Sequence, residues 1–222
     1  MKKLLFSALI KFVLGALVVG LLVFLPAGSL GYTDGWVFMG ILFIPMLLLG
    51  AVLLFKAPSL LEKRLDSKEK DASQRGVVGL SGLMFLAGFV VAGLDFRFGW
   101  SDIPSWLKVT AAVIFLLSYG GYAEVMRENE YLSRTVKVSE GQKVIDRGLY
   151  GIVRHPMYLV TVFMFLSIPI VLGSVWAFVI FLLYPVLTVI RLLNEEKLLE
   201  RELEGYAEYK KRVKYRLIPF VW

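Results

Sequence analysis

The residues best suited to chemistry lie in the second half of the chain, where two polar clusters border apolar stretches. The first cluster contains Arg154, His155, Pro156 and Tyr158. Proline favours the first position of a helix, so a helix that begins at Pro156 would leave unbonded N–H groups at its start. Such N–H groups bind carboxylates and other anions. The alternative is an interfacial anchor, in which Arg154 and His155 extend toward lipid headgroups.

The second cluster lies where the last apolar stretch of the chain ends. Arg191 and Glu195 are four residues apart, and in a helix this spacing places both side chains on one face. An ion pair that ends a helix would explain the spacing, although arginine before glutamate is the weaker order for such a pair. Ionisable groups at membrane depth are also candidates for a functional site. The spacing alone leaves both interpretations open.

A third polar segment, residues 205–216, alternates tyrosines with lysines and arginines. Aromatic and basic side chains together are typical of a segment that lies on anionic lipid. We therefore expect residues 205–216 to lie at the membrane surface, where they can cover a site formed by the two clusters.

The absence of several residue types and motifs excludes other chemistry. The chain has no cysteine and one histidine, so thiolate chemistry, disulfides and metal sites with two imidazoles are excluded, and we expect no metal. The sequence lacks the glycine-rich dinucleotide fingerprint, the phosphate-binding loop, and the zinc-protease and serine-hydrolase motifs. A nucleotide-like cofactor would therefore not bind on a Rossmann fold.

The composition predicts that a membrane protein holds these clusters. The chain has 222 residues, of which 58% are hydrophobic and 19% are charged. Ordinary soluble domains are about 45–50% apolar. We expect an all-α, polytopic membrane protein with about six transmembrane helices. The expected spans are residues 4–25, 36–55, 77–94 and 106–122, followed by a tight hairpin over residues 159–193.

The hairpin is the least regular of these spans. Pro169 and residues 172–174 interrupt its middle, and its first arm is short unless it begins near Pro156. A re-entrant first arm over residues 156–171 is the alternative to a full crossing. Elsewhere, small residues in the span 77–94 would let neighbouring helices approach closely; they include Gly79, Gly82, Gly88 and Gly93.

The distribution of basic residues predicts the orientation. Lysine and arginine concentrate in residues 56–75, 127–154 and 191–216 and at the N-terminus, and such an excess marks the cytoplasmic side of a membrane. We therefore expect both termini and the active site at the cytoplasmic face of the cell membrane. The same bias explains the net charge of +7 without nucleic-acid binding. The loop 62–75 mixes both signs and is expected to be solvated.

In this order the clusters resemble the isoprenylcysteine carboxyl methyltransferase and phospholipid methyltransferase superfamily of integral membrane enzymes. The resemblance covers about residues 125–222, and the first three spans match only as generic membrane helices. The matching elements are Gly148-x-Tyr150-x-x-x-Arg154-His155-Pro156-x-Tyr158, a hydrophobic hairpin, Glu195-Glu196 with Leu198-Leu199, and Tyr206-x-x-Tyr209-x-x-Arg212-Val213 with Leu217-Ile218-Pro219.

The resemblance implies S-adenosylmethionine as the methyl donor, bound in a pocket that the C-terminal helical segment closes. We expect residues 1–125 to be a scaffold of four spans and residues 126–222 to be the cofactor-binding, catalytic half of one integrated domain. The resemblance implies a lipid-like or hydrophobic acceptor: an isoprenylcysteine carboxylate, a phospholipid amine or a hydrophobic thiol. Membrane lipids are the expected partners.

The resemblance also implies roles for individual residues. The strand-like stretch that contains Gln142, Val144 and Ile145 would line the adenosyl pocket, and Tyr150 would pack on the cofactor. Glu195 would contact the cofactor, and Arg191 would face the methyl acceptor. The amino-acid end of the cofactor would be held, largely through backbone groups, by His155, Pro156, Met157 and Tyr158.

Two other functions are compatible with the sequence. The first is a membrane reductase of the sterol-reductase type, which shares an architecture with these methyltransferases and would use NADPH. The second is a non-enzymatic membrane protein that binds lipid or serves as a scaffold. It predicts that the protein binds neither cofactor and tolerates substitution of Arg191 and Glu195.

Overall fold

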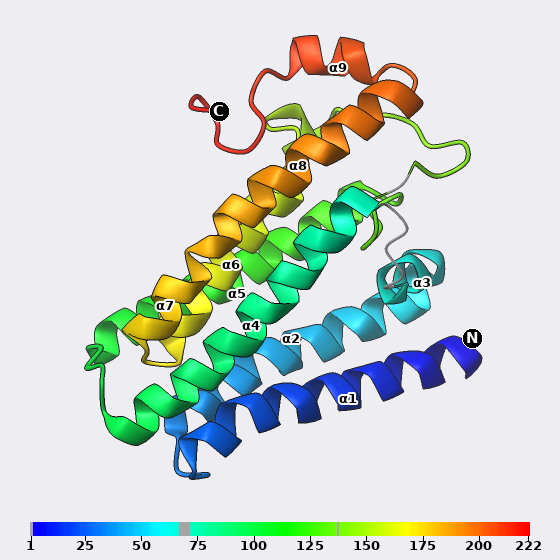
Figure 1. The fold of residues 1–222 in the computed structure, drawn as a ribbon. Helices are drawn as coiled ribbons and strands as arrows, with labels where there is room; N and C mark the ends of the chain where they lie inside the picture. Colours follow the sequence, from blue (N-terminus) through cyan, green and yellow to red (C-terminus); the bar gives the residue numbers. More distant parts are fainter. Residues whose placement is uncertain (1, 67–71, 137) are drawn as a thin grey trace.

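The computed structural model describes residues 2–66, 72–136 and 138–222, and within these ranges all regular structure is helical (Figure 1). The expected all-α fold class is thereby confirmed. The elements in chain order are α1 (Lys2–Ala27), α2 (Thr33–Lys56), α3 (Pro58–Leu65), α4 (Ala72–Phe98), α5 (Ser105–Glu128), the 3-10 helix η1 (Gly148–Gly151), α6 (Pro156–Val171), α7 (Val175–Phe181), α8 (Leu183–Glu202) and α9 (Tyr206–Arg212).

Five helical stretches are long and apolar enough to cross a membrane. They are α1, α2, α4, α5 and the stretch Val175–Glu202, which α7 and α8 form together. The outer faces of α1 and α2 carry many exposed apolar side chains, as lipid-facing surfaces do. The expected polytopic membrane protein is therefore confirmed, and each of its first four spans lies on a helix.

The predicted hairpin consists of α6 and the α7–α8 pair, joined by residues 172–174. Pro169 lies inside α6 instead of ending it, because the chain turns only at Gly173, whose φ is +74°. α6 has 16 residues and begins at Pro156, as the shortness of this arm required. Its full crossing of the bilayer stays a prediction.

Three turns meet at one end of the bundle, which we call the turn end. They comprise residues 28–32, 99–104 and 172–174, and Figure 1 shows them at the lower left. The Tyr32 hydroxyl donates a hydrogen bond to the carbonyl of Leu172, which joins the first of these turns to the third. Both chain termini, α3 and α9 lie away from this end (Figure 1).

A buried carboxylate connects the turn 99–104 to the turn 172–174. Asp95, at the end of α4, accepts hydrogen bonds from the hydroxyls of Ser101 at 2.7 Å and Ser174 at 2.5 Å. Ser174 also caps the N-terminus of α7, where its hydroxyl accepts from Ala177 N at 3.0 Å. The opposite end of the bundle contains α3, residues 129–136 and 138–155 and the C-terminal segment, and we call it the polar end.

Two of the four glycines expected to promote helix packing do so. A side chain at Gly93 would place its Cβ 2.5 Å from the carbonyl oxygen of Val23 in α1, and one at Gly88 would overlap the Phe181 ring of α7. Gly79 and Gly82 have open space where a Cβ would be. The close approaches that glycine permits on α4 therefore lie in its half nearer the turn end.

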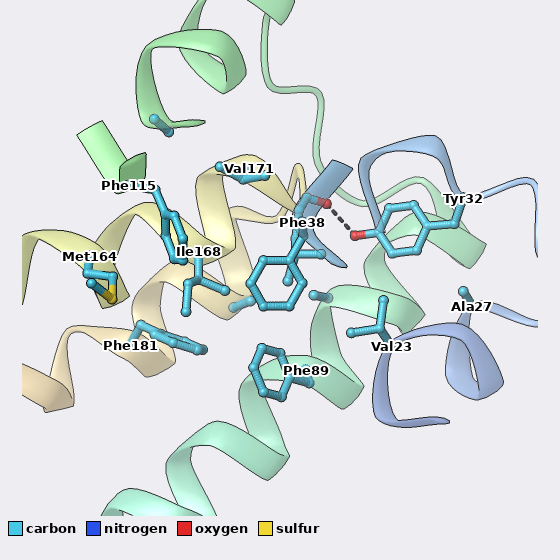
Figure 2. Close-up of a cluster of buried hydrophobic side chains, with 14 of the residues drawn as sticks. Val23, Ala27, Tyr32, Phe38, Phe89, Phe115, Met164, Ile168, Val171 and Phe181 are labelled. Atoms are coloured by element: carbon cyan, nitrogen blue, oxygen red, sulfur yellow. Dashed lines mark hydrogen bonds between the residues drawn. The ribbon is translucent and has the colours of Figure 1, made fainter. Parts of the chain in front are cut away.

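The main core lies between α1, α2 and α4 to α7. Figure 2 shows aromatic rings from α2, α4, α5 and α7 that converge on the apolar side chains of α6. Buried members of this cluster include Phe38, Phe89, Phe115, Met164, Ile168 and Phe181. This packing fixes α6 against α4 and α5, and so fixes the helix that begins at Pro156.

The prediction of a loop over residues 62–75 is wrong at both ends. Residues 62–65 belong to α3, where Glu62 is exposed, and residues 72–75 begin α4, where Gln74 is buried. Lys11 of α1 donates a 2.5 Å hydrogen bond to the carbonyl of Leu65 and so caps the C-terminal end of α3. Residues 67–71 of the predicted loop lie outside the described residues.

Candidate functional site

A cavity of about 530 Å³ opens at the polar end of the bundle. This volume is within the range of roughly 300–1,000 Å³ that small-molecule sites occupy. Nine of the ten expected site residues line the cavity; Pro156 does not, and its part is to begin α6. The nine are Gln142, Val144, Ile145, Tyr150, His155, Met157, Tyr158, Arg191 and Glu195.

Tyr158 connects the two residues of the second cluster. Its hydroxyl donates a 2.5 Å hydrogen bond to Glu195 Oε2 and accepts one of 3.1 Å from Arg191 Nε. Arg191 Nη2 also donates to the carbonyl of Arg134 at 2.8 Å. The phenol of α6 therefore sets the positions of a carboxylate and a guanidinium that both belong to α8.

At the start of α6, one backbone group expected to hold the cofactor is already bonded. The N–H of Tyr158 donates to the carbonyl of His155 at 3.1 Å, so this donor is used within the helix. What Tyr158 presents to the cavity is its side chain. Its ring centroid lies 5.7 Å from that of His155.

Glu196, the next residue after Glu195, belongs to a separate and buried network. Its Oε1 accepts hydrogen bonds from Arg154 Nε at 2.7 Å and lies 3.3 Å from His155 Nε2. Its Oε2 accepts from Arg216 Nε at 2.9 Å. Arg154 and His155 are 5% and 6% exposed. The interpretation of these two side chains as lipid-facing anchors is therefore wrong.

The same network fastens residues 213–216, which we call the strap, to the start of α6. Arg154 Nη1 donates to the carbonyls of Val213 and Lys214, at 2.8 Å each. The backbone N–H groups of Arg154 and His155 donate to strap carbonyls at 2.9 Å. The strap follows α9, so this network holds α9 over the cavity.

The stretch 142–145 is not a strand, because the described part of the chain offers it no partner strand. The Gln142 side chain accepts a 2.9 Å hydrogen bond from Ser139 N and so closes its own turn. Val144 packs against a small apolar cluster beneath α9, whose buried members are Leu203, Tyr206, Tyr209 and Val213. The stretch lines the cavity as an irregular segment.

Tyr206 of α9 belongs to a motif noted in the sequence but had no expected role in the site. Its side chain lines the cavity and is 4% exposed, and its hydroxyl has no hydrogen-bond partner among the described residues. Tyr209, by contrast, donates a 2.7 Å hydrogen bond to the carbonyl of Tyr150. Burial raises the pKa of both Tyr206 and Tyr209, so both hydroxyls keep their protons. The spacing Tyr206-x-x-Tyr209 was the available signal.

Two further residues without an expected role shape the cavity. Asn129 Nδ2 donates to the Tyr150 hydroxyl at 2.9 Å, which orients that ring. Arg64 of α3 lines the cavity and donates to the hydroxyl of Tyr122. The position of Arg64 in a stretch of mixed charge gave no signal in the sequence.

The cavity continues from the polar end into the apolar part of the bundle. There α4 contributes Val78, Ser81, Gly82 and Phe85, whose spacing places them on one helix face, and α8 contributes Tyr184, Leu187 and Thr188. Val78 and Gly82 are themselves exposed. We call this part the apolar arm, and it is suited to a hydrocarbon chain.

Comparisons with known proteins agree with this arrangement. Residues 106–204 match the model of the phospholipid methyltransferase family. The Delta(14)-sterol reductase TM7SF2 of Mus musculus is 34% identical over 91 residues, which is 40% of this chain and 22% of that protein. This chain therefore spans about a fifth of the length of that reductase. The resemblance inferred from the sequence is confirmed, because residues 106–204, which supply α6, α8 and most of the polar wall of the cavity, match the phospholipid methyltransferase family.

Proposed function

We propose that this protein transfers a methyl group from S-adenosylmethionine to a lipid-like or hydrophobic acceptor at the cytoplasmic face of the membrane. The acceptor would be of the isoprenylcysteine carboxylate, phospholipid amine or hydrophobic thiol type. The observation that carries the proposal is that one cavity joins a polar chamber to the apolar arm. Transfer from a charged donor to a hydrophobic acceptor requires a polar environment and an apolar one in contact with each other.

The polar chamber fits the donor. Glu195 would pair with the donor ammonium in a charge-assisted hydrogen bond. The Tyr206 hydroxyl, which has no partner among the described residues, offers a donor that is already desolvated. Tyr150 and Tyr158 also line the cavity, and aromatic rings can stabilise cations. When bound, a sulfonium supplies an activated methyl group, so the protein has to position the reactants and exclude water.

Arg191 would face the acceptor in this proposal. Its guanidinium carries a fixed planar set of donors, which suits a carboxylate or a phosphate. Because the Tyr158 hydroxyl is hydrogen-bonded to both Arg191 and Glu195, the acceptor-facing cation and the donor-facing carboxylate are held at a fixed separation. Tyr158 would therefore act as a positioning residue between the two substrates.

Both halves of the chain supply the site in this proposal. Residues 1–125 contribute the α3 and α4 walls of the cavity, and residues 126–222 contribute the residues assigned to the donor. The strap and α9 would close the donor chamber, since the Arg154–Glu196 network holds them in place. This sharing supports one integrated domain.

Calorimetric titration of the detergent-solubilised protein with S-adenosylmethionine tests the proposal. Saturable binding is expected for the wild type, and Glu195→Ala should weaken it at least about tenfold, the loss of roughly 1.4 kcal/mol. Glu200→Ala is the matched control, because Glu200 lies on the same helix and pairs at the surface with Lys210. A folded wild type that binds no donor, or a Glu195→Ala variant with wild-type affinity, would contradict the proposal.

A reductase that uses NADPH is the second candidate, and the 34% identity to a sterol reductase favours it. Melting temperatures of the protein with each cofactor separate the two functions, since a ligand that binds only the native state raises the melting temperature. Stabilisation by S-adenosylmethionine alone would exclude the reductase and support the methyltransferase. Stabilisation by NADPH alone would establish the reductase and overturn the primary proposal.

A further inference from the structure

Arg64 gives the cavity a second guanidinium close to Arg191. Arg64 Nη1 donates to the carbonyl of Ser133 at 3.3 Å, and Arg191 Nη2 donates to the carbonyl of Arg134 at 2.8 Å. These carbonyls belong to consecutive residues, so one peptide segment anchors both cations. Two side chains that are far apart in the sequence, one from α3 and one from α8, thus meet at the same wall of the cavity.

The contacts of Arg64 are with neutral groups. Besides the Ser133 carbonyl, it donates to the hydroxyl of Tyr122, and its guanidinium lies 5.3 Å from the centroid of that ring. Within the described residues, Arg64 has no carboxylate at ion-pair distance. An arginine has five N–H donors, so two such contacts leave it able to bind an anion in the cavity.

The charge balance of the cavity points the same way. Among the described residues that line it, the basic ones outnumber the acidic ones, because Glu195 is the one acid. Glu196 neutralises Arg154 from outside this set. A sulfonium donor would add further positive charge, and like charges in a partly desolvated site repel strongly. The basic lining residues are Arg64, Arg134, Lys143, Arg154 and Arg191.

We propose that Arg64 and Arg191 together bind an anionic oxygen group on the acceptor, so that the substrates are amphiphiles with an oxyanion at the boundary between polar chamber and apolar arm. Phosphate and carboxylate share this chemistry. The inference rests on the proposed function, because it names the acceptor class of the same site. Arg64 would act as a specificity-determining residue supplied by the N-terminal half of the chain.

Three probes with matched chemistry test the inference on the full chain in dodecyl maltoside micelles. They are dodecyl phosphate, dodecyltrimethylammonium with the same hydrocarbon chain, and inorganic phosphate. Apparent affinities come from the rise in melting temperature with probe concentration. Dodecyl phosphate should bind, while the cationic probe should not bind and inorganic phosphate should bind much more weakly. This comparison needs no substitution.

Substitutions then assign the site. Arg64→Gln should weaken dodecyl phosphate binding about tenfold or more, and Arg64→Lys should lose less because it keeps the charge. Lys63→Gln is the matched control: it removes one positive charge from the same helix, where Lys63 donates to the Glu130 carbonyl and does not line the cavity. Its affinity for dodecyl phosphate should equal that of the wild type.

Each failure has its own signature. Equal binding of the anionic and cationic amphiphiles, or equal losses in Arg64→Gln and Lys63→Gln, would overturn the oxyanion site. If inorganic phosphate bound as tightly as dodecyl phosphate, Arg64 and Arg191 would bind a free oxyanion. That result would overturn the proposal that the ligand is an amphiphile. Calorimetry with S-adenosylmethionine runs beside these assays, so loss of the donor site in the wild type would mark failure of the proposed function instead.

Discussion

Arg154 Nε donates a 2.7 Å hydrogen bond to Glu196 Oε1 across 42 positions of the chain, and both side chains are buried. Arg216 of the strap binds the other oxygen of the same carboxylate. Removing one partner of a buried ion pair costs roughly 3–5 kcal/mol, because the other charge stays buried without compensation. Glu196→Ala should therefore lower the free energy of unfolding by about this amount.

Chemical denaturation followed by helical circular dichroism measures this loss. Glu195→Ala is the control, since it removes the adjacent carboxylate, which is only half-buried and faces the cavity. We expect Glu195→Ala to cost less stability than Glu196→Ala while it weakens donor binding. Equal destabilisation by the two substitutions would show that the buried network does not hold the strap.

Tyr206→Phe separates binding from folding. The substitution removes a buried hydroxyl that has no partner in the described structure, so the stability of the unliganded protein should stay the same or rise. The affinity for S-adenosylmethionine should fall about fivefold, which is the worth of one hydrogen bond near 1 kcal/mol. Calorimetry and thermal unfolding on the same samples measure both effects.

The comparison variant is Tyr209→Phe, three residues along the same helix. It leaves the Tyr150 carbonyl without its 2.7 Å hydrogen bond, so it should cost roughly 1–3 kcal/mol of stability. If Tyr206→Phe destabilised the protein as much as Tyr209→Phe and left the donor affinity unchanged, Tyr206 would be a structural residue only.

Alkaline pH should loosen the closure of the cavity. Burial raises the pKa of Tyr150, Tyr206 and Tyr209 in the folded protein. A raised folded-state pKa contributes stability that is fully present below the ordinary tyrosine value of about 10 and is lost as the pH rises above it. We therefore expect the stability of the α9 region to be independent of pH near neutrality and to decline above about pH 10.

Phenolate absorbance and limited proteolysis of the C-terminal segment, recorded across this range, test the prediction. Compared with the wild type, the double variant Tyr206→Phe and Tyr209→Phe should lose less protection at alkaline pH. At neutral pH, however, it should be less stable to denaturant than the wild type. Phenolates that form at the ordinary pKa while α9 stays protected would contradict it.

Much of this fold follows from apolar runs and a few punctuating residues. Pro156 predicted where α6 begins, because proline suits the first turn of a helix, and Gly173 allowed the turn that follows. Pro169 was a poor guide to the end of that helix, since membrane helices tolerate proline when neighbouring groups replace the lost hydrogen bond.

The site was predicted less completely, for reasons of geometry. Adjacent residues on a helix point about 100° apart, so Glu195 faces the cavity while Glu196 faces the strap. Only the position of the strap decides which of the two carboxylates lies in the cavity. Arg64 was missed because mixed charge is typical of surfaces. Its role depends on α3 folding against the polar end, which no local pattern indicates.

The apolar arm makes a last prediction, about the acceptor. Gly82 lines the arm and has open space where a Cβ would be, so Gly82→Leu should fold normally and place a side chain in the arm. Replacing a helical glycine also removes a penalty of about 1 kcal/mol, which favours folding. The variant should raise the KM for a long-chain acceptor at least severalfold and leave the donor affinity unchanged.

Gly79→Leu is the matched control for the apolar arm. Gly79 lies one turn away on α4, has the same open surroundings, and does not line the cavity. Steady-state kinetics with the acceptor found by screening, beside calorimetry with S-adenosylmethionine, compares the two variants. A KM that rises in Gly82→Leu alone would place the hydrocarbon chain between α4 and α8, because the two substitutions add the same side chain to the same helix. Equal kinetics in both variants would mean that the acceptor reaches Arg191 by another route.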